Sequence, residues 1–351
     1  MTRTNELKYT SVEICAGAGG QAVGLHLAGF RHAALIEIDK DACETLRANT
    51  ERSPEWGGCK VIQADLRNFD SAGLGITPGT LDLLAGGVPC PPFSAAGKQL
   101  GREDERDLFP TMLRLVDELE PKAVMIENVR GLLDPKFAEY REEIVKDLEG
   151  LGYEACYWDI LEARNYAVPQ LRPRAILVAM RPEYARYFEH HKPAETRVVT
   201  VGEVLHDSMR TRYDAVVDDP RTEGAFKRWY EKALEGVAPT VVGGSKKHGG
   251  ADLGPTRAKR AWAELGVCAL GVANEPSDMK DAERDLFSSA GPKLTVTQAA
   301  LIQGFPPEWR FSGRKTAAYR QVGNAFPPPV AQAVGNQIYA ALEAAAKASE
   351  R

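Results

Sequence analysis

Short apolar runs alternate with amphipathic segments along the first 180 residues of the chain. Apolar runs of strand length between segments of helical spacing predict alternating β-strands and α-helices. Such alternation favours an α/β fold with a doubly wound, mostly parallel sheet and helices on both faces. We expect strands at 11–15, 33–38, 60–63, 81–85, 123–127, 155–161 and 175–179, with helices ending at about 29 and 49 and others at 106–120 and 137–151.

The alternation stops after about Arg181. Residues 186–318 are rich in Gly, Pro, Lys and Arg and contain few periodic segments, which is typical of a smaller, irregular domain. A new pattern begins at Tyr319 and leads into an alanine-rich helix expected at 330–347. We therefore predict one domain formed by 1–185 together with 319–351 and a second domain formed by 186–318.

Composition narrows the class of protein. The 351 residues carry a formal net charge of −5, which argues against binding nucleic acid over the whole surface but allows a local basic patch. No apolar run is long enough to span a membrane and the amino-terminal segment has no signal-type apolar stretch, so we expect a cytoplasmic protein that binds no membrane. The six cysteines form no Cys-x-x-Cys pair, and His190 and His191 lack further ligands, so we expect reduced thiols and no metal site.

A glycine-rich segment, EICAGAGG, follows the first expected strand and opens the first expected helix. Glycines there let a ligand approach the N–H groups of a helix N-terminus, although a tight turn without a ligand is the simpler alternative. Glu37 ends the second strand, placed to hydrogen-bond a ribose, and Asp65 follows the third, placed to accept from an adenine amino group. Each acid alone would be a solvated strand end, but together they favour a nucleoside-containing cofactor. The absence of a Lys-Ser/Thr pair disfavours ATP.

Cys90 stands among three prolines in GGVPCPPFS, directly after the fourth expected strand. Because proline fixes φ and forces extended geometry on the residue before it, the thiol is expected on a stiff loop. An isolated cysteine is most often a small, buried apolar residue. This loop, however, follows a strand of an open α/β sheet, where ligands bind, and its position favours a reactive thiol.

Charged residues are expected beside the Cys90 loop. Glu127 ends the fifth strand, and a carboxyl group there needs a partner because burying an unpaired charge is costly. Arg172 and Arg174 in QLRPR are two residues apart and so share one face of an extended segment. With Cys90 they predict a reaction centre in which an arginine favours the thiolate and Glu127 acts as an acid or hydrogen-bond donor. A purely structural ion pair between Glu127 and one of the arginines stays an open alternative.

Six segments resemble, in this order, the motifs of the DNA cytosine-5 methyltransferases: EICAGAGG, GGVPCPPFS, ENV, QLRPR, LTVTQAALIQGFP and YRQVGNAFPPPVA. The resemblance spans nearly the whole chain and implies the S-adenosylmethionine-dependent methyltransferase fold. It makes 1–185 plus 319–351 the catalytic, cofactor-binding domain, makes 186–318 the target-recognition domain, and implies S-adenosyl-L-methionine as the cofactor. The residues then expected at the cofactor site are Ala16, Gly17, Ala18, Gly19, Gly20, Glu37, Ile38, Asp65, Leu66, Gly87, Pro89, Leu108, Asn324 and Ala325.

The resemblance also implies a mechanism, the transfer of a methyl group to carbon 5 of a cytosine in DNA. The base is flipped out because its atoms cannot be reached in the stack. Cys90 adds to carbon 6 while Glu127 hydrogen-bonds or protonates ring nitrogen 3, which makes carbon 5 nucleophilic. A base then removes the carbon 5 proton and Cys90 leaves. Arg174, with Arg172 as a second candidate, would hold the base oxygen and orient Glu127.

The resemblance further implies sequence-specific binding of double-stranded DNA. Thr240-Val241 resembles the family's Thr-plus-aliphatic dipeptide, and the cations that follow it could neutralise phosphates, although a charge run is often only a solvated face. A restriction–modification role would add a cognate restriction endonuclease that shares the target site, without a stable complex. The residues expected to contact DNA are Ser94, Gln170, Thr240, Val241, Lys246, Lys247, Arg257, Lys259 and Arg260.

Two segments depart from the family pattern. Glu13-Ile14-Cys15 stands where Asp-Leu-Phe is usual, which removes an aromatic contact to the adenine of the cofactor. An Arg-Glu pair and a later arginine usually precede Gly-Phe-Pro, and here Thr297, Gln298 and Leu301 stand at those places. The second departure raises the question of how that segment braces the second domain.

Three other functions fit parts of the sequence. An amino-group methyltransferase carries Asp, Asn or Ser before Pro-Pro-aromatic, and the thiol of Cys90 cannot hold an amino group as those side chains do. A related tRNA methyltransferase would show a Cys-Phe-Thr segment, which this sequence lacks. A DNA-binding regulator with an inactive methyltransferase fold would not need Cys90, Glu127 and both arginines together.

Overall fold

The computed structural model describes residues 5–51, 53–89, 107–191, 193, 197–243 and 251–350. The chain divides into two compact units. The first comprises Met1–Leu161, Pro173–Lys192 and Val330–Arg351, and the second comprises Glu162–Arg172 and Pro193–Pro329. No helix in the described ranges is long and apolar enough to cross a membrane.

The boundaries of these units differ from the domain boundaries expected from the sequence. Residues 162–172 and 319–329 belong to the second unit, and 186–192 belong to the first. The chain changes unit within QLRPR, because Arg172 bonds to backbone carbonyls of the second unit while Arg174 lies in a strand of the first. The assignment of one unit to catalysis and the other to target recognition stays a prediction.

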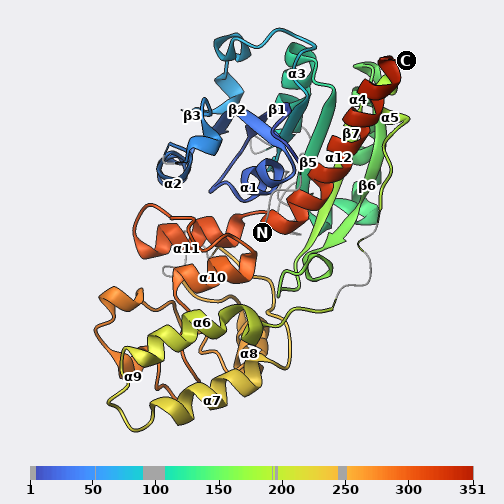
Figure 1. Ribbon diagram of the computed structural model, residues 1–351. Helices are drawn as coiled ribbons and strands as arrows, with labels where there is room; N and C mark the ends of the chain where they lie inside the picture. The colour runs from blue at the N-terminus through green and yellow to red at the C-terminus, as the bar shows by residue number, and fades with distance from the viewer. Residues whose placement is uncertain are drawn as a thin grey trace. The chain divides into compact units, whose positions relative to one another are not determined.

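A seven-stranded sheet forms the centre of the first unit, in the order β3-β2-β1-β4-β5-β7-β6 (Figure 1). Four neighbouring pairs, β1–β2, β1–β4, β2–β3 and β4–β5, are parallel, and β7 runs antiparallel to β5. The doubly wound, mostly parallel sheet expected from the sequence is confirmed. The strands are β1 Tyr9–Ile14, β2 Phe30–Glu37, β3 Lys60–Gln63, β4 Leu83–Gly86, β5 Ala123–Val129, β6 Glu154–Glu162 and β7 Pro173–Met180.

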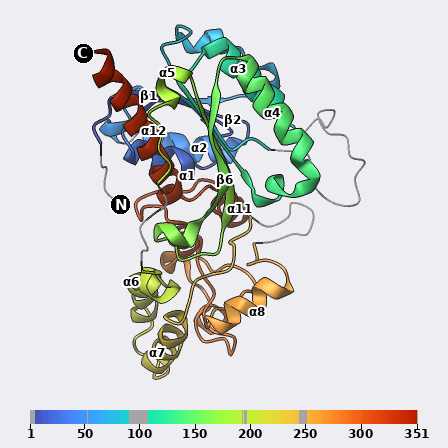
Figure 2. The same ribbon diagram turned by 90° about the vertical axis from the view of Figure 1, so that its right-hand side faces the viewer.

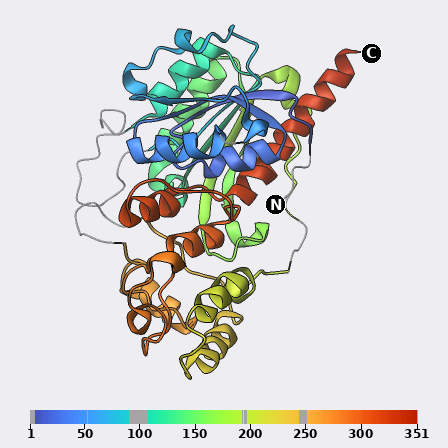
Figure 3. The ribbon, with the colours of Figure 1, turned by 60° about the vertical axis from the view of Figure 1, so that its left-hand side comes forward.

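Helices cover both faces of this sheet (Figures 2 and 3). On one face, the apolar positions of α3 repeat every three or four residues and join Val12 and Ile14 of β1 in a single core. On the other face, α12 packs against α1 so closely that a Cβ on Gly335 would lie 2.8 Å from the Cβ of Ala28. The helices of this unit are α1 Gly20–Leu27, α2 Lys40–Thr50, α3 Phe109–Leu119, α4 Ala138–Gly150, α5 Pro182–Ala185 and α12 Pro328–Ser349.

Strands β1, β4 and β5 bring their carboxyl ends to one edge of the sheet, since Ile14, Gly86 and Ile126 are register partners. The glycine segment after β1, residues 87–89 after β4 and Glu127 of β5 therefore gather at the edge where open α/β sheets bind ligands. Close strand packing requires glycine at position 86, because a Cβ there would lie 2.6 Å from Cγ1 of Ile14.

The second unit is helical in the part that the structure describes (Figures 1 and 2). We expected a more irregular segment, because these helices are short and lie between glycine- and proline-rich loops. Capping boxes begin two of them, formed by Thr200 with Glu203 and by Thr295 with Gln298. The helices are α6 Val201–Asp214, α7 Thr222–Ala233, α8 Thr256–Glu264, α9 Ala282–Asp285, α10 Val296–Gln303 and α11 Lys315–Asn324.

A buried arginine from α6 braces the start of α10, where the sequence departs from the family pattern. Nη1 of Arg212 donates to Oε1 of Gln298 at 2.8 Å and to the Lys293 carbonyl at 2.6 Å, and Nη2 donates to the Asp285 carbonyl at 3.3 Å. Burial lowers the pKa of Arg212 to about 10, so the guanidinium stays charged at neutral pH. At the adjacent position, the Thr297 N–H donates to Oε1 of Glu275 at 3.0 Å. Contacts from outside α10 thus hold the segment that lacks the Arg-Glu pair.

Replacing Arg212 with leucine is expected to destabilise the second unit, because three acceptors each lose a hydrogen bond from a buried guanidinium. A hydrogen bond to a charged group contributes about 1.5–3 kcal/mol, so we expect the free energy of unfolding to fall by about 3 kcal/mol or more. Urea unfolding followed by the fluorescence of Trp229, Trp262 and Trp309, which all lie in this unit, measures the loss. Arg228→Leu on the exposed side of α7 is the control, and an equal loss in both variants would contradict the brace.

Candidate active site

The glycine segment after β1 forms a turn in which every second residue has a left-handed backbone conformation. Cys15, Gly17 and Gly19 have φ of 51°, 53° and 87°, and Gly19 is the N-cap of α1. A Cβ on Gly17 would meet nothing within 4 Å, so the backbone there borders open space that a ligand can enter. Burial raises the pKa of the Cys15 thiol, which makes this group a neutral apolar side chain rather than a second nucleophile.

Glu37 ties the end of β2 to this turn. Its Oε2 accepts from the Gly17 N–H at 2.8 Å, and its Oε1 accepts from the N–H groups of Ile38 and Asp39, both at 2.8 Å. The carboxylate is therefore held in one orientation beside the glycine segment, and the expected ribose contact stays a prediction. Ile38 is 59% exposed at the same place, an unusual position for a large apolar side chain without a ligand.

Asp65 follows β3 as the sequence indicates, but a neighbouring arginine occupies its carboxylate. Both oxygens face Arg67, with Nη2 of Arg67 2.5 Å from Oδ2 and Nε 2.9 Å from Oδ1. These hydrogen bonds from Arg67 hold the pKa of Asp65 below its usual value. Any contact with an adenine amino group must therefore share the carboxylate with Arg67. Leu66, the next residue, is buried.

Two buried polar side chains flank the glycine segment in sequence without a hydrogen-bond partner among the described residues. They are Glu13, through Oε2, and Gln21, through both amide atoms. Burial, with a smaller contribution from the charge of Glu37, raises the pKa of Glu13 well above its ordinary value. Orphaned buried polar groups are rare because each is costly, and they point to a polar molecule that completes the site. The sequence analysis named Glu13 only as part of a departure from the family pattern and did not single out Gln21. Both residues fit a polar cofactor at the glycine segment.

The carboxyl end of β5 carries a largely buried ion pair. Oε1 of Glu127 lies 2.7 Å from Nε of Arg174, and their side chains are 14% and 12% exposed. Arg174 reaches this position because it pairs with Val129 in the antiparallel register of β7 with β5. Gly87, after β4, faces the pair, since a Cβ there would lie 3.0 Å from Oε2 of Glu127. The expected meeting of Glu127 with an arginine is therefore present, and the arginine is Arg174.

Hydrogen bonds hold the two borders of the loop that contains Cys90. The Leu108 N–H donates to the Pro89 carbonyl at 3.2 Å, and Nδ2 of Asn128 donates to the Val88 carbonyl at 2.9 Å. The buried carboxylate of Asp107 accepts from the Tyr140 hydroxyl at 2.7 Å. These contacts place residues 89 and 108 side by side next to the end of β5. Cys90 and Ser94 themselves lie outside the described residues.

The structure gives Arg172 a role different from the expected catalytic one. The side chain is 1% exposed and its guanidinium donates to the carbonyls of Val241, Gly323 and Ala325, all in the second unit. We therefore replace the expectation of a catalytic Arg172 with a structural one. The error arose because a two-residue spacing predicts a shared face, whereas the chain passes from one unit to the other between Arg172 and Pro173.

Gln170 is also buried rather than presented to DNA. Its Oε1 accepts from the Val241 N–H at 2.8 Å, and its Nε2 donates to Oε1 of Gln303 at 2.5 Å. Gln303 donates in turn to the carbonyls of Val322 and Ala325 at 3.0 and 2.7 Å. Gln170 is 0% exposed, so the expected DNA contact is corrected to a structural role. Gln303 stands in LTVTQAALIQGFP, but nothing in that motif alone identifies its partners.

The remaining residues expected to contact DNA differ in their surroundings. Val241 is buried, and the hydroxyl of Thr240 donates to the Leu171 carbonyl at 2.6 Å. On α8, Arg257 and Arg260 are exposed, while Lys259 forms an ion pair with Asp252 at 2.8 Å. Lys246 and Lys247 lie outside the described residues. Asn324 and Ala325, expected at the cofactor site, stand at the end of α11 in the second unit.

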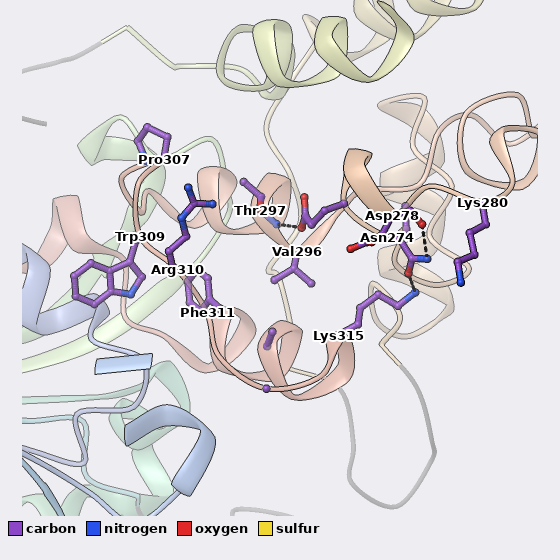
Figure 4. A pocket seen from close by; sticks show the side chains of 14 residues that line it. Asn274, Asp278, Lys280, Val296, Thr297, Pro307, Trp309, Arg310, Phe311 and Lys315 are labelled. Atoms are coloured by element: carbon purple, nitrogen blue, oxygen red, sulfur yellow. Dashed lines mark hydrogen bonds between the residues drawn. The ribbon is translucent and has the colours of Figure 1, made fainter. Parts of the chain in front are cut away.

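A cavity of about 520 Å³ opens in the second unit beside the start of α10 (Figure 4). Val296 and Thr297 border it together with Trp309 and Lys315, whose amine donates to Oδ1 of Asn274 at 2.9 Å. Acidic and basic side chains both line this cavity, so its charge favours no single class of ligand. We therefore assign it no part in the reaction.

The buried carboxyl of Glu13 makes stability depend on pH. The pKa of Glu13 is raised in the folded state, so its contribution to stability is full below the ordinary carboxyl value of 4.5 and is lost as the pH rises toward the folded pKa. Glu13→Gln removes this titration, so the variant should gain stability over the wild type from pH 4.5 to pH 7, by up to about 1.4 kcal/mol for each pH unit. Urea unfolding at several pH values measures the difference. The exposed Glu149→Gln is the control, and a difference that does not change with pH would contradict this account of Glu13.

Comparison with known proteins identifies the chain. The type II methyltransferase M.NaeI of Lentzea aerocolonigenes is 50% identical over 341 residues, which cover 97% of this chain and 77% of that protein. The type II methyltransferase M.NgoMIV of Neisseria gonorrhoeae is 48% identical over 341 residues, which cover 96% of this chain and 99% of that protein. A crystal structure of DNMT2 from Spodoptera frugiperda shares the fold, with a TM-score of 0.62 at 14% identity over 95% of this chain and 100% of that chain.

The model of the C-5 cytosine-specific DNA methylases matches residues 9–340. Members of this family use S-adenosylmethionine and act on DNA. The match spans the glycine segment, the end of β5 and the segment with Asn324. The chain therefore belongs to the C-5 cytosine-specific DNA methylase family and is a DNA cytosine-5 methyltransferase.

Proposed function

We propose that this methyltransferase modifies a cytosine flipped out of double-stranded DNA through a covalent adduct with Cys90, using S-adenosylmethionine bound at the glycine segment. The observation that carries the proposal is the ion pair of Glu127 with Arg174 at 2.7 Å, beside Gly87 and at the end of the strand next to the one that precedes Cys90. A carboxyl group fixed by a guanidinium at a ligand-binding edge of the sheet suits the positioning of a polar base.

The glycine segment and the neighbouring strand ends would hold the cofactor. Oε2 of Glu37 accepts one hydrogen bond from Gly17, which leaves it a further lone pair for a ribose hydroxyl. The exposed side chain of Ile38 would cover the adenine, and Glu13 and Gln21 would meet polar groups of the cofactor directly or through water. Bound S-adenosylmethionine would supply the methyl group. The remaining proposed contacts are Ala16, Ala18, Gly19, Gly20, Asp65, Leu66, Gly87, Pro89, Leu108, Asn324 and Ala325.

Cys90 and Glu127 would activate the base. The Cys90 thiolate forms a bond to carbon 6 while Glu127 hydrogen-bonds or protonates ring nitrogen 3, so that the electron pair of the former double bond becomes available at carbon 5. After carbon 5 has been methylated, a base removes its proton, the ring double bond re-forms and the thiolate leaves. Arg174 holds the Glu127 carboxyl in place and would also hold the base oxygen.

The second unit would bind the duplex. Base flipping requires contacts that fix the phosphates on either side of the target, and the exposed Arg257 and Arg260 of α8 are available for this. Thr240 and the cations Lys246, Lys247 and Lys259 would add to these contacts, with Ser94 beside the base. In a restriction–modification pair, the cognate endonuclease would recognise the same site and act as a separate protein.

Variants at three positions test the proposed mechanism by the transfer of labelled methyl groups to plasmid DNA. Cys90→Ala should abolish transfer, because no other group forms the bond to carbon 6. Glu127→Gln should lower kcat by about 10²-fold or more, the usual contribution of a positioned proton donor. Arg174→Met should lower kcat by at least about tenfold, because the Glu127 carboxyl loses its orientation.

Arg181→Met is the matched control for the arginine variant. Arg181 directly follows β7 and pairs with a glutamate, Glu120, at 3.0 Å. It lies at the opposite end of β7 from Arg174. This variant should retain wild-type kcat. Bisulfite sequencing of plasmids from cells that express each variant should reveal protected cytosines at a recurrent site only where transfer is retained. Protected cytosines in plasmids from cells that express Cys90→Ala would contradict the covalent mechanism.

A further inference from the structure

Two segments with different expected functions lie in backbone contact inside the second unit. One is 240–243, which contains the Thr240-Val241 dipeptide expected at DNA, and the other is 323–325, which contains Asn324, expected at the cofactor. A Cβ on Gly323 would lie 2.3 Å from the nitrogen of Gly243 and 2.4 Å from the carbonyl carbon of Val242. No side chain fits between these backbones, so the two segments move together or separate completely.

Hydrogen bonds tie the same two segments to each other. One guanidinium, that of Arg172, donates to the Val241 carbonyl at 2.7 Å and to the Gly323 and Ala325 carbonyls at 2.8 and 2.9 Å. The pair Gln170–Gln303 makes a second tie, because Gln170 accepts from the Val241 N–H and Gln303 donates to the Ala325 carbonyl. These side chains are buried, so the ties are shielded from competing water.

The side chain of Asn324 rests on Gly243. A Cβ on Gly243 would lie 2.3 Å from Oδ1 and 3.0 Å from Cγ of Asn324, and 2.9 Å from the Arg320 carbonyl oxygen, which means that the amide and the backbone of α11 both pack directly on the glycine. Asn324 is exposed, and within the described ranges its amide has no hydrogen-bond partner. Among the described residues, packing against Gly243 therefore sets where this amide points.

We propose that Gly243 is a positioning residue for the cofactor, because it sets the side-chain orientation of Asn324 from within segment 240–243, which contains the dipeptide expected at DNA. This inference rests on the proposed function, in which Asn324 contacts S-adenosylmethionine. A residue that follows the DNA-contacting dipeptide would then determine affinity for the cofactor. By linkage, a shift of 240–243 when DNA binds changes the affinity for the cofactor, and bound cofactor changes the affinity for DNA by the same factor.

A double-mutant cycle tests the proposal through the Kd of S-adenosylmethionine, measured by calorimetry on the full chain. Asn324→Ala should weaken binding by about tenfold, as expected for the loss of one polar contact to a ligand. Gly243→Ala should weaken it by a similar factor, because the new methyl group displaces the Asn324 amide. In the Asn324→Ala background the amide is gone and only the Arg320 carbonyl faces the new methyl group, so the further loss from Gly243→Ala should be much smaller than its loss in the wild type.

Gly236→Ala is the matched control in the same unit, since a Cβ there would lie at an ordinary 3.6 Å from Leu265, and it should bind as the wild type does. Wild-type affinity for Gly243→Ala, or a loss that adds in full to that of Asn324→Ala, would overturn the positioning role. Wild-type affinity for Asn324→Ala would instead show that the proposed cofactor contact is wrong, and the inference would fall with it.

Hydrogen exchange of the wild-type protein provides a second test that does not depend on how Gly243→Ala folds. Because the two segments form one joint, S-adenosylmethionine should slow exchange of the amides at 240–243 as well as those at 323–325. Protection confined to 323–325 would contradict the proposal. Melting temperatures of all variants accompany the binding measurements, so that a loss of affinity is compared only between folded proteins.

Discussion

The ion pair between Glu127 and Arg174 depends on one reversed strand. Five neighbouring strands of the sheet are parallel, and their carboxyl ends meet at the edge that carries the glycine segment and the residues before Cys90. A parallel β7 would begin at the opposite edge. Because β7 runs antiparallel to β5, its first residues instead lie beside the end of β5, and Arg174 pairs in register with Val129. The reversal thus delivers the guanidinium to Glu127.

The same short segment also joins the two units of the chain. Arg172 and Arg174 flank Pro173, and the change from the second unit to the first occurs between Arg172 and Pro173. One arginine serves the carboxyl group at the proposed reaction centre, and the other holds backbone carbonyls of Val241, Gly323 and Ala325. Removing a partner from a buried, charged hydrogen-bond cluster is far more costly than the net contribution of the cluster. Substitution of Arg174 is therefore expected to impair catalysis, and substitution of Arg172 is expected to impair stability.

Much of the first unit could be predicted from the sequence. Each expected strand is present, because buried parallel strands form short apolar runs and the helices between them have regular apolar spacing. The pairing of Glu127 with an arginine could also be predicted, since a carboxyl group at a buried strand end needs a cation. The orphaned polar atoms of Glu13 and Gln21 could not, because burial by distant elements leaves no local pattern.

The second unit was harder to predict, for physical reasons that particular residues illustrate. Its helices are short, and capping boxes such as that of Thr295 with Gln298 begin them more clearly than any apolar periodicity does. Arg172 bonds to backbone carbonyls, and Gln170 and Arg212 each bond to backbone groups as well as to side chains. Every residue type offers those backbone groups, so no sequence signal marks the partner. For this reason Arg172 was predicted to be catalytic and Gln170 to contact DNA, whereas in the structure both side chains hold the backbone.

Covalent trapping on DNA that contains 5-fluorocytosine tests the central claim most directly. Fluorine at carbon 5 cannot leave as a proton does, so the bond between the nucleophile and carbon 6 persists after the methyl group has been transferred. We expect mass spectrometry to find the DNA adduct on the peptide that contains Cys90, in the presence of S-adenosylmethionine, and none in Cys90→Ala. An adduct on another cysteine, or methylated DNA with no adduct, would contradict the account.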